Sequence, residues 1–116
     1  IIYNKYMLTP EKEEGNVEYK RLISNCHNRF ESLASQMKWR LIEGNGICYY
    51  YIGIEDNGSI SKMSRLSLYK SLTNLKKISN IINSQITKIE LFNNNLSEYL
   101  IVEIKKKFNI NYLFLF

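Results

Sequence analysis

The stretch Ile47-Cys48-Tyr49-Tyr50-Tyr51-Ile52-Gly53-Ile54 decides the fold, because it is the strongest strand signal in the chain. It is apolar or aromatic on both faces, so we expect both faces to be at least partly covered. Alternation places Tyr49 and Tyr51 on one face and Tyr50 on the other. These rings could stack nucleic-acid bases, but the flanking residues lack the consensus of RNA-reading sheets and favour packing in the sheet and core.

A turn follows this strand at Glu55-Asp56-Asn57-Gly58. Asn-Gly favours the type I′ turn of a tight hairpin, which predicts a returning strand at about 59–63. The adjacent carboxylates of Glu55 and Asp56 could form an acid–base or metal pair. Neighbouring side chains in a turn seldom converge on one point, so turn formation is the favoured interpretation.

A helix is predicted before the central strand, over residues 28–43. Its apolar stripe has helical spacing and consists of Phe30, Leu33, Ala34, Met37 and Leu41. Asn28 is the expected N-cap, with Glu31 three positions later as in a capping box. Gly44 is the expected stop. Residues 17–23 have the composition of an earlier strand.

A second helix is predicted from Ser64 or Ser67 to about residue 83, followed by strands at 85–92 and 97–104. The order is therefore β-α-β-β-α-β-β. This order predicts an α+β fold: a two-layer sandwich with two helices on a mixed sheet of four to five strands. We expect a single domain over 15–105, with a tail or linker at 1–14 and a further tail at 106–116.

Composition favours anionic partners and argues against several other classes. The 116 residues carry a net charge of +5, which suits RNA phosphates. The candidate RNA contacts lie on or beside the predicted elements: Lys20, Arg21, Lys38, Lys62 and Arg65. Ordinary solvated faces are the competing interpretation. The two cysteines lack metal-ligand spacing and indicate a reducing, cytoplasmic compartment, and no run is long enough to span a membrane, so no membrane partner is expected.

Catalytic signatures are absent from the sequence, so we predict no catalytic, cofactor-binding or metal-binding residue. There is no GxxxxGK[ST], GxGxxG or GxSxG pattern. The glycine pair Gly44 and Gly46 could form a phosphate nest, but a helix stop followed by a turn is favoured. Cys26 beside His27 could be a nucleophile and its base, yet nothing around the pair supports this role.

The only tryptophan, Trp39, lies opposite the apolar stripe of the first predicted helix. Gln36, Arg40 and Glu43 lie beside it, and together these four residues form a candidate docking surface. The N-terminal segment, a loop, a neighbouring domain or a partner must therefore cover Trp39. Trp and Arg are favoured anchors of interfaces, which supports the last two possibilities.

Three blocks resemble, in order and spacing, the region before the G domain in the GTP-binding protein 1 and 2 family of elongation-factor-like translational GTPases. They are "EEGNVEYKRLI" (13–23), "SQMKWRLIEGNG" (35–46) and "YIGIEDNGSI" (51–60), and "SLYKSLTNLKKIS" (67–79) resembles the helix that follows. Two departures are Gly46-Ile47-Cys48, where the family usually has Gly-Glu-Ala, and Lys62-Met63, where it tends to have Gly-Leu. A weaker resemblance joins "VEYK" and "IGIEDNGSI" to AlbA-like domains of the Schlafen group.

The family resemblance implies a non-catalytic accessory domain of a GTPase. GTP and Mg²⁺ would then bind only in the G domain of the parent protein, and "NINYLFLF" (109–116) would be a G-domain strand or an insertion. The implied partners are that G domain, ribosomal RNA or transfer RNA. A purely structural docking module is the first alternative, and a nucleic-acid-binding AlbA-like domain is the second.

Overall fold

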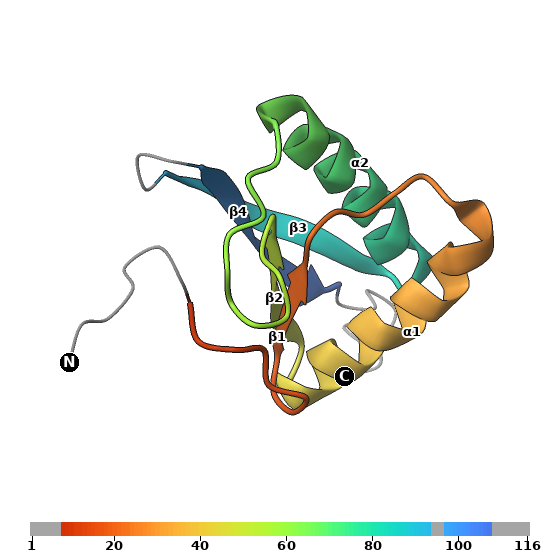
Figure 1. The fold of residues 1–116 in the computed structure, drawn as a ribbon. Coiled ribbons are helices and arrows are strands. Elements are labelled where there is room, and N and C mark those ends of the chain that lie inside the picture. Colours follow the sequence, from red (N-terminus) through yellow and green to blue (C-terminus); the bar gives the residue numbers. More distant parts are fainter. Residues whose placement is uncertain (1–7, 94–96, 108–116) are drawn as a thin grey trace, which may run out of the picture.

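The computed structural model describes residues 8–93 and 97–107 of the chain. They form a two-layer α+β sandwich with the order β1 (Val17–Lys20), α1 (His27–Glu43), β2 (Ile47–Ile52), α2 (Arg65–Ile81), β3 (Ser84–Asn93) and β4 (Glu98–Lys106). The predicted fold class, with two helices on a mixed sheet, is confirmed. Figure 1 shows how the two helices lie relative to the sheet.

The sheet has four strands in the order β1-β2-β4-β3. β1 and β2 are parallel and are connected through α1, whereas β4 is antiparallel to both of its neighbours. The long antiparallel pair β3–β4 has a bulge between Ile86 and Lys88. The two edges are thus the four-residue β1 and the ten-residue β3.

The core lies between the helices and one face of the sheet, because β2 and β4 each send every second side chain to that side. Cys48, Tyr50 and Ile52 of β2 are buried there beside alternate residues of β4. Tyr49 and Tyr51 lie on the other face and are half-buried. The alternation predicted for the three tyrosines is therefore confirmed.

Two local predictions are wrong. α1 begins at His27 after Cys26, without a side-chain capping bond, so Asn28 lies inside the helix. The returning strand at 59–63 is reduced to one bridge between Ile54 and Ile60. Its turn is not type I′, since Gly58 alone in the turn has positive φ, at 92°, whereas a type I′ turn requires positive φ at both central residues. Residues 59–63 instead lead directly into α2.

The start of α2 and the glycine stop of α1 are as expected. The Ser64 hydroxyl accepts a hydrogen bond from the Ser67 N–H, so Ser64 is the N-cap of α2. Gly44 ends α1, and a Cβ there would lie 1.8 Å from the Ile47 carbonyl oxygen. The chain can therefore turn from α1 into β2 only with glycine at this position.

The segment before β1 belongs to the domain, although we predicted a tail up to residue 14. The Leu8 N–H donates to the Gly58 carbonyl at 2.7 Å, and the Glu11 N–H donates to the Asp56 carbonyl at 2.8 Å. At the other end β4 extends to Lys106. The predicted tail residues 1–7 and 108–116 lie outside the described residues.

Candidate nucleic-acid interface and the buried Arg40 cluster

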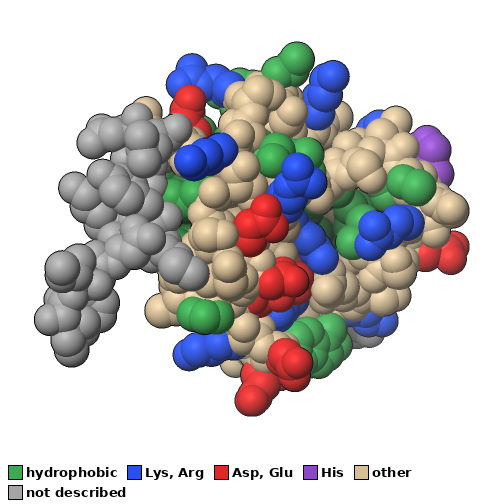
Figure 2. Space-filling view, in the orientation of Figure 1, with side chains coloured by type: hydrophobic (Ala, Val, Ile, Leu, Met, Phe, Trp, Pro, Cys, Tyr) green, Lys and Arg blue, Asp and Glu red, His purple; other side chains and the backbone are tan. Residues whose placement is uncertain are grey.

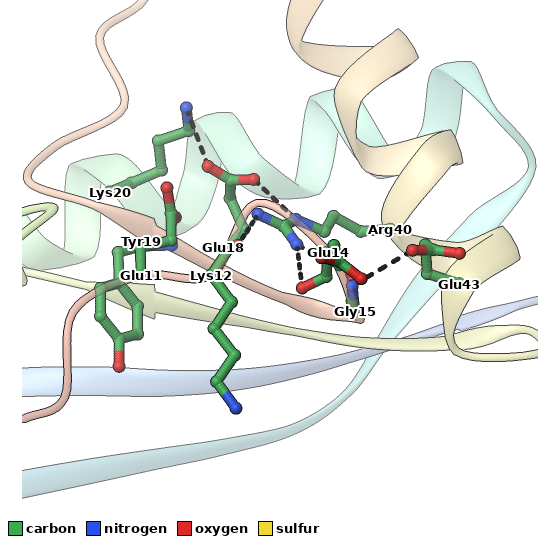
Figure 3. Close-up of polar contacts among 9 residues, drawn as sticks. All are labelled: Glu11, Lys12, Glu14, Gly15, Glu18, Tyr19, Lys20, Arg40 and Glu43. Atoms are coloured by element: carbon green, nitrogen blue, oxygen red, sulfur yellow. Dashed lines mark hydrogen bonds and ion pairs between the residues drawn. The ribbon is translucent and has the colours of Figure 1, made fainter.

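Arg40 is buried, so the structure removes it from the predicted docking surface. Its side chain is 3% exposed, and its Nε donates to Glu18 Oε1 at 2.9 Å. The remaining guanidinium nitrogens donate to three backbone carbonyls of the N-terminal segment, those of Lys12, Glu14 and Gly15. We call Arg40, Glu18 and these three carbonyls the Arg40 cluster (Figure 3).

The Arg40 cluster is structural in its chemistry. Glu18 is as deeply buried as Arg40, and Lys20 also reaches it at 3.4 Å. The guanidinium directs its hydrogen bonds to groups of its own chain. A buried ion pair of this kind holds segments in place when its other donors are satisfied. The cluster therefore joins α1, β1 and the segment before β1.

Glu11 lies next to this cluster and accepts a hydrogen bond from the Tyr19 N–H. Burial is the main cause that raises the pKa of the Glu11 carboxyl above its ordinary value of 4.5, and the nearby Glu18 charge raises it further. The bond from Tyr19 acts in the opposite direction. Among the residues that the structure describes, no three acidic, Cys or His side chains are grouped to hold a metal ion.

The other three residues of the predicted docking surface have different environments. Trp39 is 42% exposed, and the Arg40 guanidinium carbon lies 4.9 Å from its ring centroid. Glu43 is exposed and accepts a bond from the Gly15 N–H at 3.2 Å. Gln36 is half-buried, and its Oε1 has no hydrogen-bond partner among the residues that the structure describes. Only part of the predicted surface is thus available, with Trp39 at its centre.

Acidic side chains neutralise three of the five predicted RNA contacts. Lys20 pairs with buried Glu18 at 3.4 Å. Arg21 lies 3.6 Å from Glu55, and Arg65 contacts both carboxylate oxygens of Glu98. Of the five, Lys38 and Lys62 alone are exposed without an ion pair in the described part of the chain.

α2 carries basic residues that lie outside the five predicted RNA contacts. Residues 57–89 contain six basic residues and no Asp or Glu. Lys70, Lys76 and Lys77 of α2 are exposed, and none makes an ion pair with another described residue. In Figure 2 the charged side chains in the upper half of the molecule, where Figure 1 places α2, are mainly Lys and Arg, whereas most carboxylates lie lower. The acid-free run is the sequence signal that could have located this surface.

Two grooves flank α2 and share this charge. The groove toward residues 22–25 has a volume of about 450 Å³ and contains Lys70 and Lys77. The groove toward β3 has a volume of about 480 Å³ and contains Lys76 and Lys107. Neither is lined by Asp or Glu, and both also present Ser, Thr or Asn side chains. We call Lys70, Lys76, Lys77 and Lys107 the α2 lysine surface.

Comparisons with known proteins confirm the family resemblance. The chain is 42% identical over 85 residues to GTP-binding protein 2 of human and of mouse, a match that covers 72% of this chain. It is 37% identical over 87 residues to uncharacterized protein R625 of Acanthamoeba polyphaga mimivirus. The matches span only 14% of the mammalian proteins and 47% of the viral one. No family model and no solved structure matches the chain.

Proposed function

Since this chain is a relative of GTP-binding protein 2, we propose that it is a non-catalytic accessory domain of a GTP-binding protein that contacts RNA. The observation that carries the proposal is the α2 lysine surface. Its cations are exposed and form no ion pair within the described part of the chain, whereas Lys20, Arg21 and Arg65 each face a carboxylate. Ribosomal RNA and transfer RNA are the expected partners.

The chemistry of the two grooves suits a phosphate backbone better than individual bases. Lysine supplies point charges that attract phosphates without reading sequence. Thr73 and Asn80, at the groove walls, add donors of the type that contact phosphate oxygens. The net charge of +5 adds a long-range attraction to the same polyanion. We therefore propose binding that depends on charge and on the shape of the RNA.

The experiment measures binding of the 116-residue chain to transfer RNA and to ribosomal RNA fragments by fluorescence anisotropy at several salt concentrations. The logarithm of the binding constant should fall linearly with the logarithm of the salt concentration. The double variant Lys70→Ala/Lys77→Ala should bind more weakly and show a shallower slope, by about 0.7 to 0.9 for each lost phosphate contact.

The matched control is Arg21→Ala/Arg65→Ala, which removes the same number of charges from sites that carboxylates already neutralise. The control should retain most of the affinity and of the slope. Equal losses in the two double variants, or an affinity that salt does not change, would refute RNA binding by the α2 lysine surface.

Docking on the parent's own G domain is the second candidate function, and exposed apolar side chains support it. Trp39 is 42% exposed and Ile42, one turn further along α1, is 65% exposed. In the full-length parent, Trp39→Ala should change GTP hydrolysis without changing RNA affinity. An unchanged rate of hydrolysis would argue against such docking. An AlbA-like domain would also bind nucleic acid, so the RNA-binding experiment described above tests this alternative as well.

We propose that GTP and Mg²⁺ bind in the parent's G domain and that this chain binds neither. Calorimetric titration of the 116-residue chain with GTP and Mg²⁺ should then give no binding heat, and a saturable signal would refute this assignment. We place the parent in the cytoplasm. Within the described ranges, neither helix is long and apolar enough to cross a membrane.

A further inference from the structure

Among the described residues, the outer edge of β3 is open to another strand. β3 is ten residues long, and β4 is its one neighbour in the part of the sheet that the structure describes. The opposite edge, β1, is only four residues long, and Glu11 occupies the N–H of Tyr19 there. Within residues 8–93 and 97–107, no strand pairs with the free edge of β3. A long edge with unpaired backbone groups is a template for another chain.

Apolar side chains of β3 are left exposed on the helix side of the sheet. Ile89 pairs with Val102 and Leu91 with Leu100, and both β4 partners are buried beneath the helices. Directly paired residues point to the same face. Even so, Ile89 is 48% exposed and Leu91 is 40% exposed. An additional strand beside β3 would cover these two side chains.

The opposite face of β3 carries one charge of each sign. Lys88 and Glu90 are exposed, and the Lys88 Nζ lies 2.8 Å from the Glu90 Oε1 within the strand. Phe92 follows on the same face and stacks on Tyr99, with ring centroids 5.3 Å apart. Along β3, a cation therefore precedes Ile89 and an anion follows it.

We propose that β3 pairs in antiparallel fashion with β3 of a second copy of this chain, with Ile89 opposite Ile89 at the two-fold axis. In that register Lys88 of each copy faces Glu90 of the other, so two opposite-charge pairs form. The pairing extends the sheet from four strands to eight and makes an isologous interface.

Charge complementarity favours a second copy of the chain as the occupant and disfavours the two neighbouring registers. A two-fold axis perpendicular to the sheet keeps the helix layers of both copies on the same side of the sheet. The register between the two β3 strands can then change only by steps that leave each side chain on its original face. The neighbouring allowed registers place Lys88 opposite Lys88 or Glu90 opposite Glu90, and like charges directly opposite are unfavourable. The bulge at Ile86/Lys88 limits the paired segment to the residues after it. The interface is small, and we expect a weak dimer.

The experiment measures self-association of the 116-residue chain by sedimentation velocity over a concentration series up to the millimolar range. The unaltered chain should form dimers reversibly. Lys88→Glu and Glu90→Lys should each weaken dimerisation by about tenfold or more, because each places like charges opposite one another twice. The double variant Lys88→Glu/Glu90→Lys should restore the original association.

A mixture of the two single variants is the decisive arm. A homodimer of either variant places only like charges opposite one another. A Lys88→Glu chain and a Glu90→Lys chain, by contrast, place opposite charges opposite one another across the proposed interface. The mixture should therefore form heterodimers with the original affinity, detected with one variant labelled. A chain that stays monomeric at every concentration, or a mixture no stronger than either variant alone, would overturn the proposal. Circular dichroism of each variant verifies that it is folded.

Discussion

Trp39 and Arg40 are adjacent in α1 but have opposite environments. Trp39 is 42% exposed, whereas Arg40 is 3% exposed. A guanidinium tolerates burial only when its charge and its donors are satisfied, and Glu18 with three backbone carbonyls does this here. The N-terminal segment thus covers Arg40 and leaves the indole largely uncovered.

Arg40→Met should lower the free energy of unfolding by about 3 kcal/mol, because it leaves Glu18 buried with a weaker partner. The value lies at the low end of the usual range, since Lys20 stays beside the Glu18 carboxylate. Urea denaturation monitored by circular dichroism measures it. Lys38→Met, at an exposed neighbouring position, is the control and should change stability by less than about 0.5 kcal/mol. Similar losses in both variants would contradict a structural role for Arg40.

Glu11→Gln should change how stability depends on pH. The raised pKa means that the folded state binds the Glu11 proton more tightly than the unfolded state does. The stability from this group is therefore fully present below its unfolded pKa and is lost as pH rises through the folded pKa. The amide can still accept the Tyr19 N–H. Relative to the original chain, the variant should gain stability as pH rises above the ordinary pKa of a glutamate, about 4.3, in urea titrations. A difference that does not change with pH would contradict this assignment.

At the scale of elements, the two helices begin in different ways. The Ser64 hydroxyl satisfies the N–H of Ser67 at the start of α2, at 3.1 Å. α1 has no side-chain cap, and the Arg29 N–H donates to the Cys26 carbonyl instead. A propensity rule located both helices to within a few residues but identified only one of the two caps.

Ser64→Ala should therefore destabilise the protein by about 1 kcal/mol, the usual cost of removing a serine N-cap. Asn28→Ala is the matched control, because Asn28 lies inside α1 and is exposed. It should change stability by less than about 0.5 kcal/mol. Thermal denaturation followed by circular dichroism compares the two, and a larger effect for Asn28 would restore the capping-box prediction.

At the scale of the whole molecule, the two cysteines report on different parts of the fold. Cys48 lies on β2, belongs to the hydrophobic core and has no exposed surface. Cys26 directly precedes α1 and is half-buried. Burial raises the pKa of the Cys48 thiol to about 12. The thiolate is the reactive form, so Cys48 is protected both by packing and by its protonation.

A thiol reagent at pH 8 should label Cys26 rapidly and Cys48 only when the whole domain unfolds. The Cys26→Ser variant isolates Cys48, and its labelling, followed by mass spectrometry, should accelerate with urea in parallel with global unfolding. Labelling of Cys48 that is fast and independent of urea would show that the core around β2 opens locally.

Local periodicity was enough to predict the element types and the fold class, because it distinguishes a helix from a strand without knowledge of distant contacts. Ile47–Ile52, both helices and the last two strands follow this rule. The returning strand at 59–63 failed, since a turn signal does not ensure that the residues after it find a partner strand. The Asn28 cap failed because residue type alone does not locate the first helical turn.

The tertiary structure alone decided which charges are available. Nothing in the local sequence separates the basic residues that pair with a carboxylate from those that do not. The ion-paired ones are Lys20, Arg21 and Arg65, whereas Lys70 and Lys77 have no described carboxylate within ion-pair distance. Ion pairs join residues far apart in the chain, such as Arg65 with Glu98, so periodicity cannot predict them. The same holds for Arg40, whose burial depends on where the segment before β1 folds back, and for the free edge of β3, which depends on strand order.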